Sequence, residues 1–81
     1  MPVFYRSRGY RFTVISGDHT PPHVHIIGQG GYVKAVLGKG EVEYWEIEGK
    51  ISKTTAKKLI DDLEKVLDAA WTCWNQYGGI D

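Results

Sequence analysis

The sequence is short of cysteine and contains no long apolar run. Only one of its 81 residues, Cys73, is a cysteine, so no disulfide can form within the chain and nothing indicates an oxidising compartment. No stretch approaches the ~20 apolar residues needed to cross a bilayer, and the opening MPVFYRSRG lacks the apolar core of a secretory signal. We therefore expect a cytoplasmic protein with no membrane association.

The sequence also lacks an excess of charge of either sign. Ten lysines and arginines balance ten aspartates and glutamates, whereas a dedicated duplex-binding protein usually carries a large positive excess. The charges are unevenly distributed, because residues 1–40 have a net charge of +4 and residues 41–81 a net charge of −4. This separation could guide an acidic ligand toward Arg6, Arg8 and Arg11, although solvated surface charge is the commoner origin of such a pattern.

Strand periodicity dominates the first half of the chain. The segment YRFTVI alternates between two faces, and HVHII, YVKAVL and EVEYWEI follow it, separated by the turn-forming segments SGDHTPP, GQGG and GKG. PVFYR, before the first of these, could form a further short strand, and the adjacent aromatics Tyr44 and Trp45 suggest an irregularity in the last one. We predict a three- or four-stranded antiparallel β-meander over residues 1–48.

A helical pattern follows the predicted sheet. Ser52 or Thr54 can cap a helix that begins near Lys53, and apolar residues then recur at steps of three and four as far as Trp74. We predict one long C-terminal α-helix within residues 49–78, packed on one face of the meander. The chain is then a single α+β domain, residues 1–81.

The end of the predicted helix carries three aromatic residues. A helix of ~24 residues spans roughly 36 Å, which is longer than a small sheet needs for cover. Trp71, Trp74 and Tyr77 lie in the part that would project. A stripe at this spacing is more often core, but the overhang also suits a surface for a partner or for a homodimer, and both interpretations stay open.

All three histidines lie in one motif, HTPPHVH, residues 19–25. Residues two apart in a strand point the same way, with Cα atoms ~6.6 Å apart, so His23 and His25 should lie side by side. His19 would lie ~12 Å from His23 if the Thr-Pro-Pro step is extended. A cis bond before Pro21 or Pro22 would bend the chain and bring the three rings together.

Three interpretations of the histidine cluster stay open. His19, His23 and His25 could hold a transition metal such as zinc, with Asp18 or a glutamate of EVEYWEI completing the ligands. They could instead act as acid and base without a metal, with Arg11 holding a developing phosphate charge. In a purely structural role, the imidazoles would bond backbone groups left without partners by the two prolines.

The motif DHTPPHVH on a short strand, followed by EGKIS opening a helix, resembles a prokaryotic family catalogued as domain of unknown function 4160. The core H-x-P-P-H-x-H is specific, the preceding aromatic strand YRFTVI fits, and so does Trp74 near the helix end. Ser16 and Gly17 stand where the family often has aromatic residues. The resemblance implies no established reaction. It implies a component of a toxin-antitoxin-like pair, encoded beside another small protein.

Two functions from different classes follow. The first is a protein that binds a small partner through a sheet edge or through the aromatic helix end at Trp71, Trp74 and Tyr77. The second is a small ribonuclease or phosphodiesterase that uses His19, His23, His25 and Arg11, with RNA as its partner. A metal-binding module at His23 and His25 is a third hypothesis, and whether the chain is an enzyme stays open.

Overall fold

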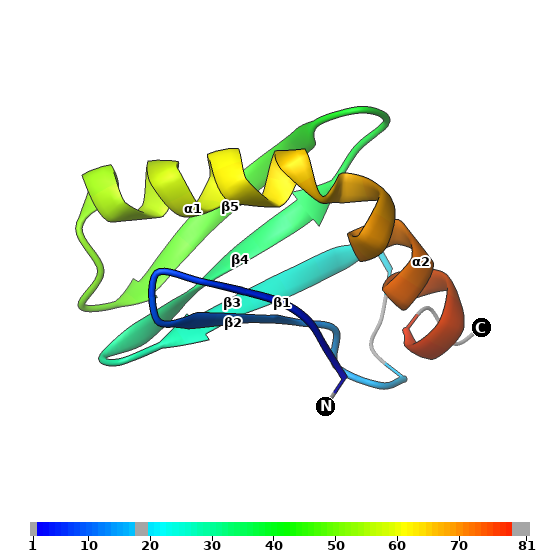
Figure 1. The fold of residues 1–81 in the computed structure, drawn as a ribbon, viewed down its shortest axis with the longest axis horizontal. Coiled ribbons are helices and arrows are strands. Elements are labelled where there is room, and N and C mark those ends of the chain that lie inside the picture. Colours follow the sequence, from blue (N-terminus) through cyan, green and yellow to red (C-terminus); the bar gives the residue numbers. More distant parts are fainter. Residues whose placement is uncertain (1, 18–19, 79–81) are drawn as a thin grey trace.

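The computed structural model describes residues 2–17 and 20–78 and shows a five-stranded antiparallel sheet followed by two helices (Figure 1). The strands lie in the sheet in sequence order, so each pairs with the next along the chain. The elements are β1 Val3–Ser7, β2 Tyr10–Thr13, β3 His23–Gly28, β4 Gly31–Leu37, β5 Val42–Gly49, α1 Lys53–Lys65 and α2 Leu67–Tyr77. The α+β class is confirmed, but the predicted three or four strands are fewer than the five observed, because YRFTVI, HVHII, YVKAVL and EVEYWEI all contribute strands and the short segment at PVFYR adds β1.

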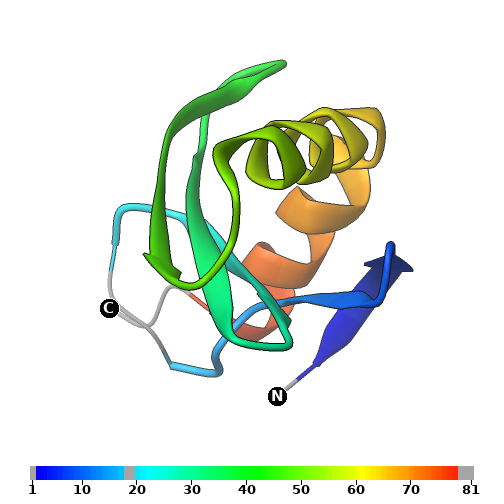
Figure 2. The same cartoon turned by 90° about the vertical axis from the view of Figure 1, so that its left-hand side faces the viewer.

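The two faces of the sheet differ in what covers them. Figure 2 shows both helices on one side, here called the inner face. The inner face is lined by fully buried apolar side chains, among them Phe12, Val24, Ile26, Val33 and Ala35. Strand alternation and register put the intervening residues on the opposite side, here called the outer face. It carries Arg6, Arg11, Thr13, His23, His25, Ile27, Tyr32, Lys34, Tyr44, Glu46 and Glu48.

The predicted single helix is in fact two, separated at Val66. The backbone there has φ −120° and ψ 29°, and its N–H donates to the carbonyl of Leu63. α1 runs along the sheet against β5, and α2 turns to pack against β1 and β3 (Figure 1). A straight helix would carry the apolar side chains of Ala70 and Trp74 past the end of the sheet, whereas the bend buries both. Packing therefore decides the break.

Local signals at the element ends behave as the sequence predicts. Ser52 is the N-cap of α1, and its hydroxyl accepts a hydrogen bond from the Thr55 amide at 3.1 Å. The β4–β5 pairing contains a bulge that leaves Glu43 as the extra residue, one position before the expected irregularity. Tyr44 and Trp45 point to opposite faces. No helix of the described residues is long and apolar enough to span a membrane.

Asp62 of α1 ties the helix to the β1–β2 turn. It is buried, accepts a hydrogen bond from the Ser7 hydroxyl at 2.7 Å and forms an ion pair with Arg8 Nε at 3.0 Å. Arg8 has a φ of 56°, a left-handed conformation that is unusual for a residue with a side chain, and Gly9 follows with φ 80°, as in a type I′ hairpin turn. The hydrogen bond from Ser7 and the charge of Arg8 lower the pKa of Asp62.

Replacing Asp62 with asparagine is expected to reduce the free energy of unfolding by about 1–2 kcal/mol at neutral pH, because two hydrogen bonds lose their charged acceptor. The folded-state pKa of Asp62 lies below its unfolded value, so its contribution is present above the unfolded pKa and is lost as pH falls through the folded one. The two proteins should therefore converge in stability in acid. Urea unfolding across this pH range measures the difference. The exposed neighbour Asp61, changed to asparagine, is the control, and a pH-independent loss in the Asp62→Asn variant would contradict the assignment.

Candidate functional site

His23 and His25 lie side by side on the outer face of β3. Their ring centroids are 5.1 Å apart, with the rings at 82° to each other. The period of two along a strand places both rings on one face, as the sequence predicts. The register adds neighbours that are distant in sequence, because His25 lies opposite Thr13 on one side and Lys34 on the other.

The His23 ring is held firmly from two directions. His23 is the first residue of β3, and at this end of the strand α2 reaches its ring. Only 6% of the residue is exposed, and its ring lies 5.4 Å from the ring of Trp74 on α2. Its Nδ1 lies 2.8 Å from the carbonyl oxygen of Pro21. A carbonyl oxygen only accepts, so Nδ1 carries a proton and donates it, and Nε2 is the basic atom of the neutral ring. This contact matches the expected structural role of an imidazole that bonds a backbone group beside the two prolines, and it fixes the orientation of the ring.

The His25 ring is the more accessible of the two. It is half-buried, between the His23 ring and the ring of Tyr32 at 5.3 Å. A ligand approaching the outer face therefore meets His25 first, and His23 can act only behind it. In any acid–base chemistry at this site, His25 would touch the substrate and His23 would position it.

His19 and Asp18 lie outside the described residues, so their membership of the cluster stays a prediction. The Thr20–Pro21 peptide bond is cis. Within residues 2–17 and 20–78, no group of three or more histidine, cysteine, aspartate or glutamate side chains is placed to hold a metal ion. Zinc binding therefore stays a prediction that depends on His19 or Asp18 joining His23 and His25. Elemental analysis of protein purified without a histidine tag tests it.

Arg11 lies on the outer face, directly opposite Ile27, which is two residues after His25 on β3. Residues that lie directly opposite one another across the strands are called a row below. Arg11 is exposed and is the diagonal cross-strand neighbour of His25. The Cα atoms of such neighbours are ~7–8 Å apart, a distance that an arginine side chain can span. Two further basic residues of this face were not singled out for the site. The β1–β2 register puts Arg6 directly opposite Arg11, and Lys34 lies opposite His25. The alternation of YVKAVL already predicts an outward-facing Lys34, whereas the Arg6–Arg11 pairing depends on a register that the sequence does not specify.

The aromatic residues of the helix end are placed differently from one another. Trp74 is 4% exposed and belongs to the core, and Trp71 is half-buried, with its indole N–H donating to the Gly38 carbonyl at 3.0 Å. Tyr77 is 44% exposed. The bend at Val66 folds this segment onto the sheet, so the two tryptophans pack within the chain and only Tyr77 offers substantial surface to a partner.

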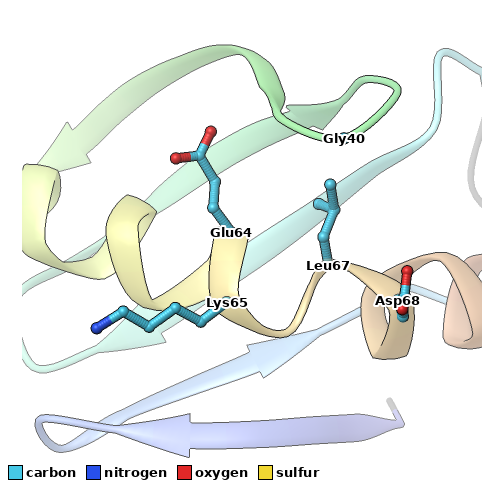
Figure 3. Close-up of a pocket in the computed structure, with 5 residues that line it drawn as sticks. All are labelled: Gly40, Glu64, Lys65, Leu67 and Asp68. Carbon is cyan, nitrogen blue, oxygen red and sulfur yellow. The ribbon is translucent and has the colours of Figure 1, made fainter.

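Two hollows in the surface lie away from the histidines. One of about 360 Å³ is lined by Arg8, Gly9, Tyr10 and Gln29. The other, of about 220 Å³, lies where the two helices meet the β4–β5 hairpin (Figure 3). Its lining residues are Gly40, Glu64, Lys65, Leu67 and Asp68. Glu64 already accepts a hydrogen bond from the Val42 amide at 2.9 Å, so this carboxylate supports the start of β5. Neither hollow is lined by a histidine, and on the outer face Thr13 and His23 are buried while His25 is half-buried.

Two other reactive groups are held in unreactive forms. Cys73 is buried, and desolvation raises the pKa of its thiol, which keeps it protonated at neutral pH. The Tyr44 hydroxyl donates to Glu46, and this bond to a carboxylate raises the pKa of Tyr44. Neither group supplies a nucleophile under ordinary conditions.

The chain is a small α+β domain with helices on one face of its sheet. The other face carries imidazole, aromatic and charged side chains. The chain belongs to the family described as domain of unknown function (DUF4160), whose sequence model matches residues 9–72. The matched region runs from the start of β2 into α2 and includes the whole histidine motif. The resemblance seen in the sequence is thereby confirmed. Neither the search of curated proteins nor that of solved structures found a match.

Proposed function

We propose that this protein acts by binding a small protein partner, as one component of a toxin-antitoxin-like pair, and that the partner docks on the edge strand β5. The observation that carries the proposal is the free side of β5. β5 is the longest strand of the described sheet, has eight residues, and is paired on one side only, with β4. An exposed edge strand offers unpaired N–H and C=O groups to a strand from another chain.

The direction of the β5 amides supports this site. The Lys50 amide donates to the Gly30 carbonyl at 2.8 Å, and the register with β4 is continuous from Tyr44 to Gly49. Because amides alternate in direction along a strand, those of Trp45 and Ile47 point away from β4. At the start of the strand, the Val42 amide already donates a hydrogen bond to the Glu64 carboxylate. The stretch from Trp45 onward is therefore the part suited to strand addition.

The charge of this edge favours a basic partner. Residues 41–50 contain four glutamates against one lysine. Two copies of β5 would bring these glutamates together, and like charges on paired strands are destabilising. A homodimer through β5 is accordingly disfavoured, and a partner with lysines or arginines on its own edge strand fits better.

The other surfaces fit a partner less well. The second edge strand, β1, has five residues and a bulge between Val3 and Tyr5, which disrupts regular pairing. At the helix end, Trp71 and Trp74 already pack within the chain. Of the two surfaces that the sequence suggested, the sheet edge is thus the stronger.

Co-expression with the protein of the neighbouring gene tests the proposal. We expect the two chains to co-purify and to elute together in size-exclusion chromatography as a complex whose mass exceeds that of either chain. If each protein elutes alone at concentrations of about 10 µM, above the dissociation constant of a specific complex, the proposal is wrong.

The geometry of the histidine pair favours a second candidate, phosphodiester cleavage without a metal. The bond from His23 Nδ1 to the Pro21 carbonyl fixes one tautomer, and the half-buried His25 lies beside His23 with Arg11 and Lys34 as neighbours. In this scheme His25 takes the proton of the attacking hydroxyl group and returns it to the leaving oxygen. His23 holds the His25 ring in position, and the cations stabilise the charge of the phosphate.

If the protein cleaves RNA, His25→Asn should lower the rate on a labelled oligouridine at least about 100-fold, the usual contribution of an acid–base group. The residue is half-buried and not part of the core, so the variant should fold. Lys57→Gln, an exposed change on α1, should leave the rate unchanged. Cleavage that persists in His25→Asn, or that is absent from the unmodified protein, would exclude this candidate.

A further inference from the structure

The outer face carries two arginines that lie directly opposite each other on neighbouring strands. Arg6 and Arg11 are direct cross-strand partners on β1 and β2, and both are exposed. Like charges directly opposite one another destabilise a sheet. Among the described residues neither forms an ion pair. Arg8, in contrast, is neutralised by the buried Asp62.

The acidic residues that the structure describes on this face are too distant to neutralise the pair. The row that contains Arg11 continues through Ile27 and Tyr32 to Glu48. Glu48 is three strands from Arg11, about 14 Å at the usual spacing between strands. Glu46 is also on β5, opposite Lys34. The basic part of the face therefore covers β1 to β4 and the acidic part covers β5.

Rings and apolar surface lie between these cations. Ile27 and Tyr32 are half-buried and follow Arg11 in its row, and Tyr32 contacts the ring of His25. Lys34 follows on the same strand, opposite His25. Cations beside a half-buried aromatic ring on a sheet face match the chemistry of single-stranded nucleic acid, since phosphates bind the cations and a base can stack on the accessible part of the ring. An acidic peptide would use the arginines and leave the rings unused.

We propose that the outer face binds single-stranded nucleic acid, with phosphates on Arg6 and Arg11 and a base on Tyr32. The strand crosses the basic part of the face and avoids the glutamates of β5. This site is separate from the edge of β5, and it concerns binding, so it stands whether or not the histidines cleave the strand.

Fluorescence anisotropy with labelled oligouridine and oligothymidine of about 12 nucleotides tests the proposal, at about 50 mM salt and above. We expect saturable binding of at least one strand, and the ratio of the two affinities separates RNA from DNA as the ligand. Changing Arg6 and Arg11 together to glutamine should weaken binding about tenfold and lower the slope of log K against log salt by about 1.4, because two phosphate contacts are lost.

Two further variants separate this site from general charge effects. The matched control changes Lys57 and Lys58 on the exposed side of α1 to glutamine and should leave the affinity unchanged. Tyr32→Leu should weaken binding about tenfold and keep the salt slope, because it removes stacking and no charge. The proposal is overturned if neither strand binds saturably, if both double variants lose the same affinity, or if a duplex or an acidic peptide of equal charge binds as well as the single strand.

Discussion

Replacing Trp74 with alanine is expected to reduce the free energy of unfolding by about 3–5 kcal/mol, the usual cost of removing a large buried aromatic side chain. Trp74 is 4% exposed, contacts the His23 ring and packs with the apolar side chains of α2 against the sheet. A domain of this size has only a small margin of stability. The variant should therefore be largely unfolded near 37 °C.

Chemical unfolding in urea, followed by circular dichroism, measures this loss. The matched control is Tyr77→Ala, one turn further along α2, where the side chain is 44% exposed and the cost should stay within about 0.5 kcal/mol. Equal and small losses in the two variants would contradict the placement of Trp74 in the core, and would return it to the partner surface that the sequence left open.

Reversing the charge of Glu48 is expected to weaken the complex with the protein of the neighbouring gene about tenfold, and adding Glu46→Lys should bring the loss to about 100-fold. Both carboxylates are exposed on β5 beside the proposed docking edge. A reversal replaces attraction for a basic partner by repulsion, and each factor of ten corresponds to about 1.4 kcal/mol. Titration calorimetry at two salt concentrations measures both the affinity and its screening.

The control for this experiment is Asp61→Lys, an equal change of charge on the exposed side of α1. It should leave the affinity for the protein partner unchanged. If Glu48→Lys and Asp61→Lys weaken the complex equally, the effect comes from net charge and not from β5. On the outer face, the same Glu48→Lys variant extends the basic region and should tighten the binding of oligouridine, so the two proposed sites respond to it in opposite directions.

Much of the fold could be predicted because local signals and packing agree. Alternation placed the strands, the glycines of GQGG and GKG marked two hairpins, and Ser52 marked the start of α1. The bend at Val66 could not be predicted in this way, because the apolar stripe continues unbroken through it and only the position of the sheet end decides where α2 must turn. The left-handed conformation of Arg8 could not be predicted either, because its contact with Asp62 joins residues 54 positions apart.

The candidate site was predictable where it depends on one strand. The period of two placed His23 and His25 together, and the same rule places Lys34 on that face. The opposition of Arg6 and Arg11 follows from the register of β1 against β2, which the turn at Arg8 and Gly9 sets. The contact between His23 and Trp74 needs the bend between the helices as well as the sheet.

The central claim is that β5 receives a strand from a protein partner, and hydrogen exchange at two amides tests it most directly. The amides of Trp45 and Ile47 point away from β4 and should exchange rapidly in the isolated protein. In the complex with the protein of the neighbouring gene, nuclear magnetic resonance should show both amides strongly protected, while the amides of the other edge strand, β1, keep their rates. A stable complex in which Trp45 and Ile47 exchange as fast as before would contradict docking at β5.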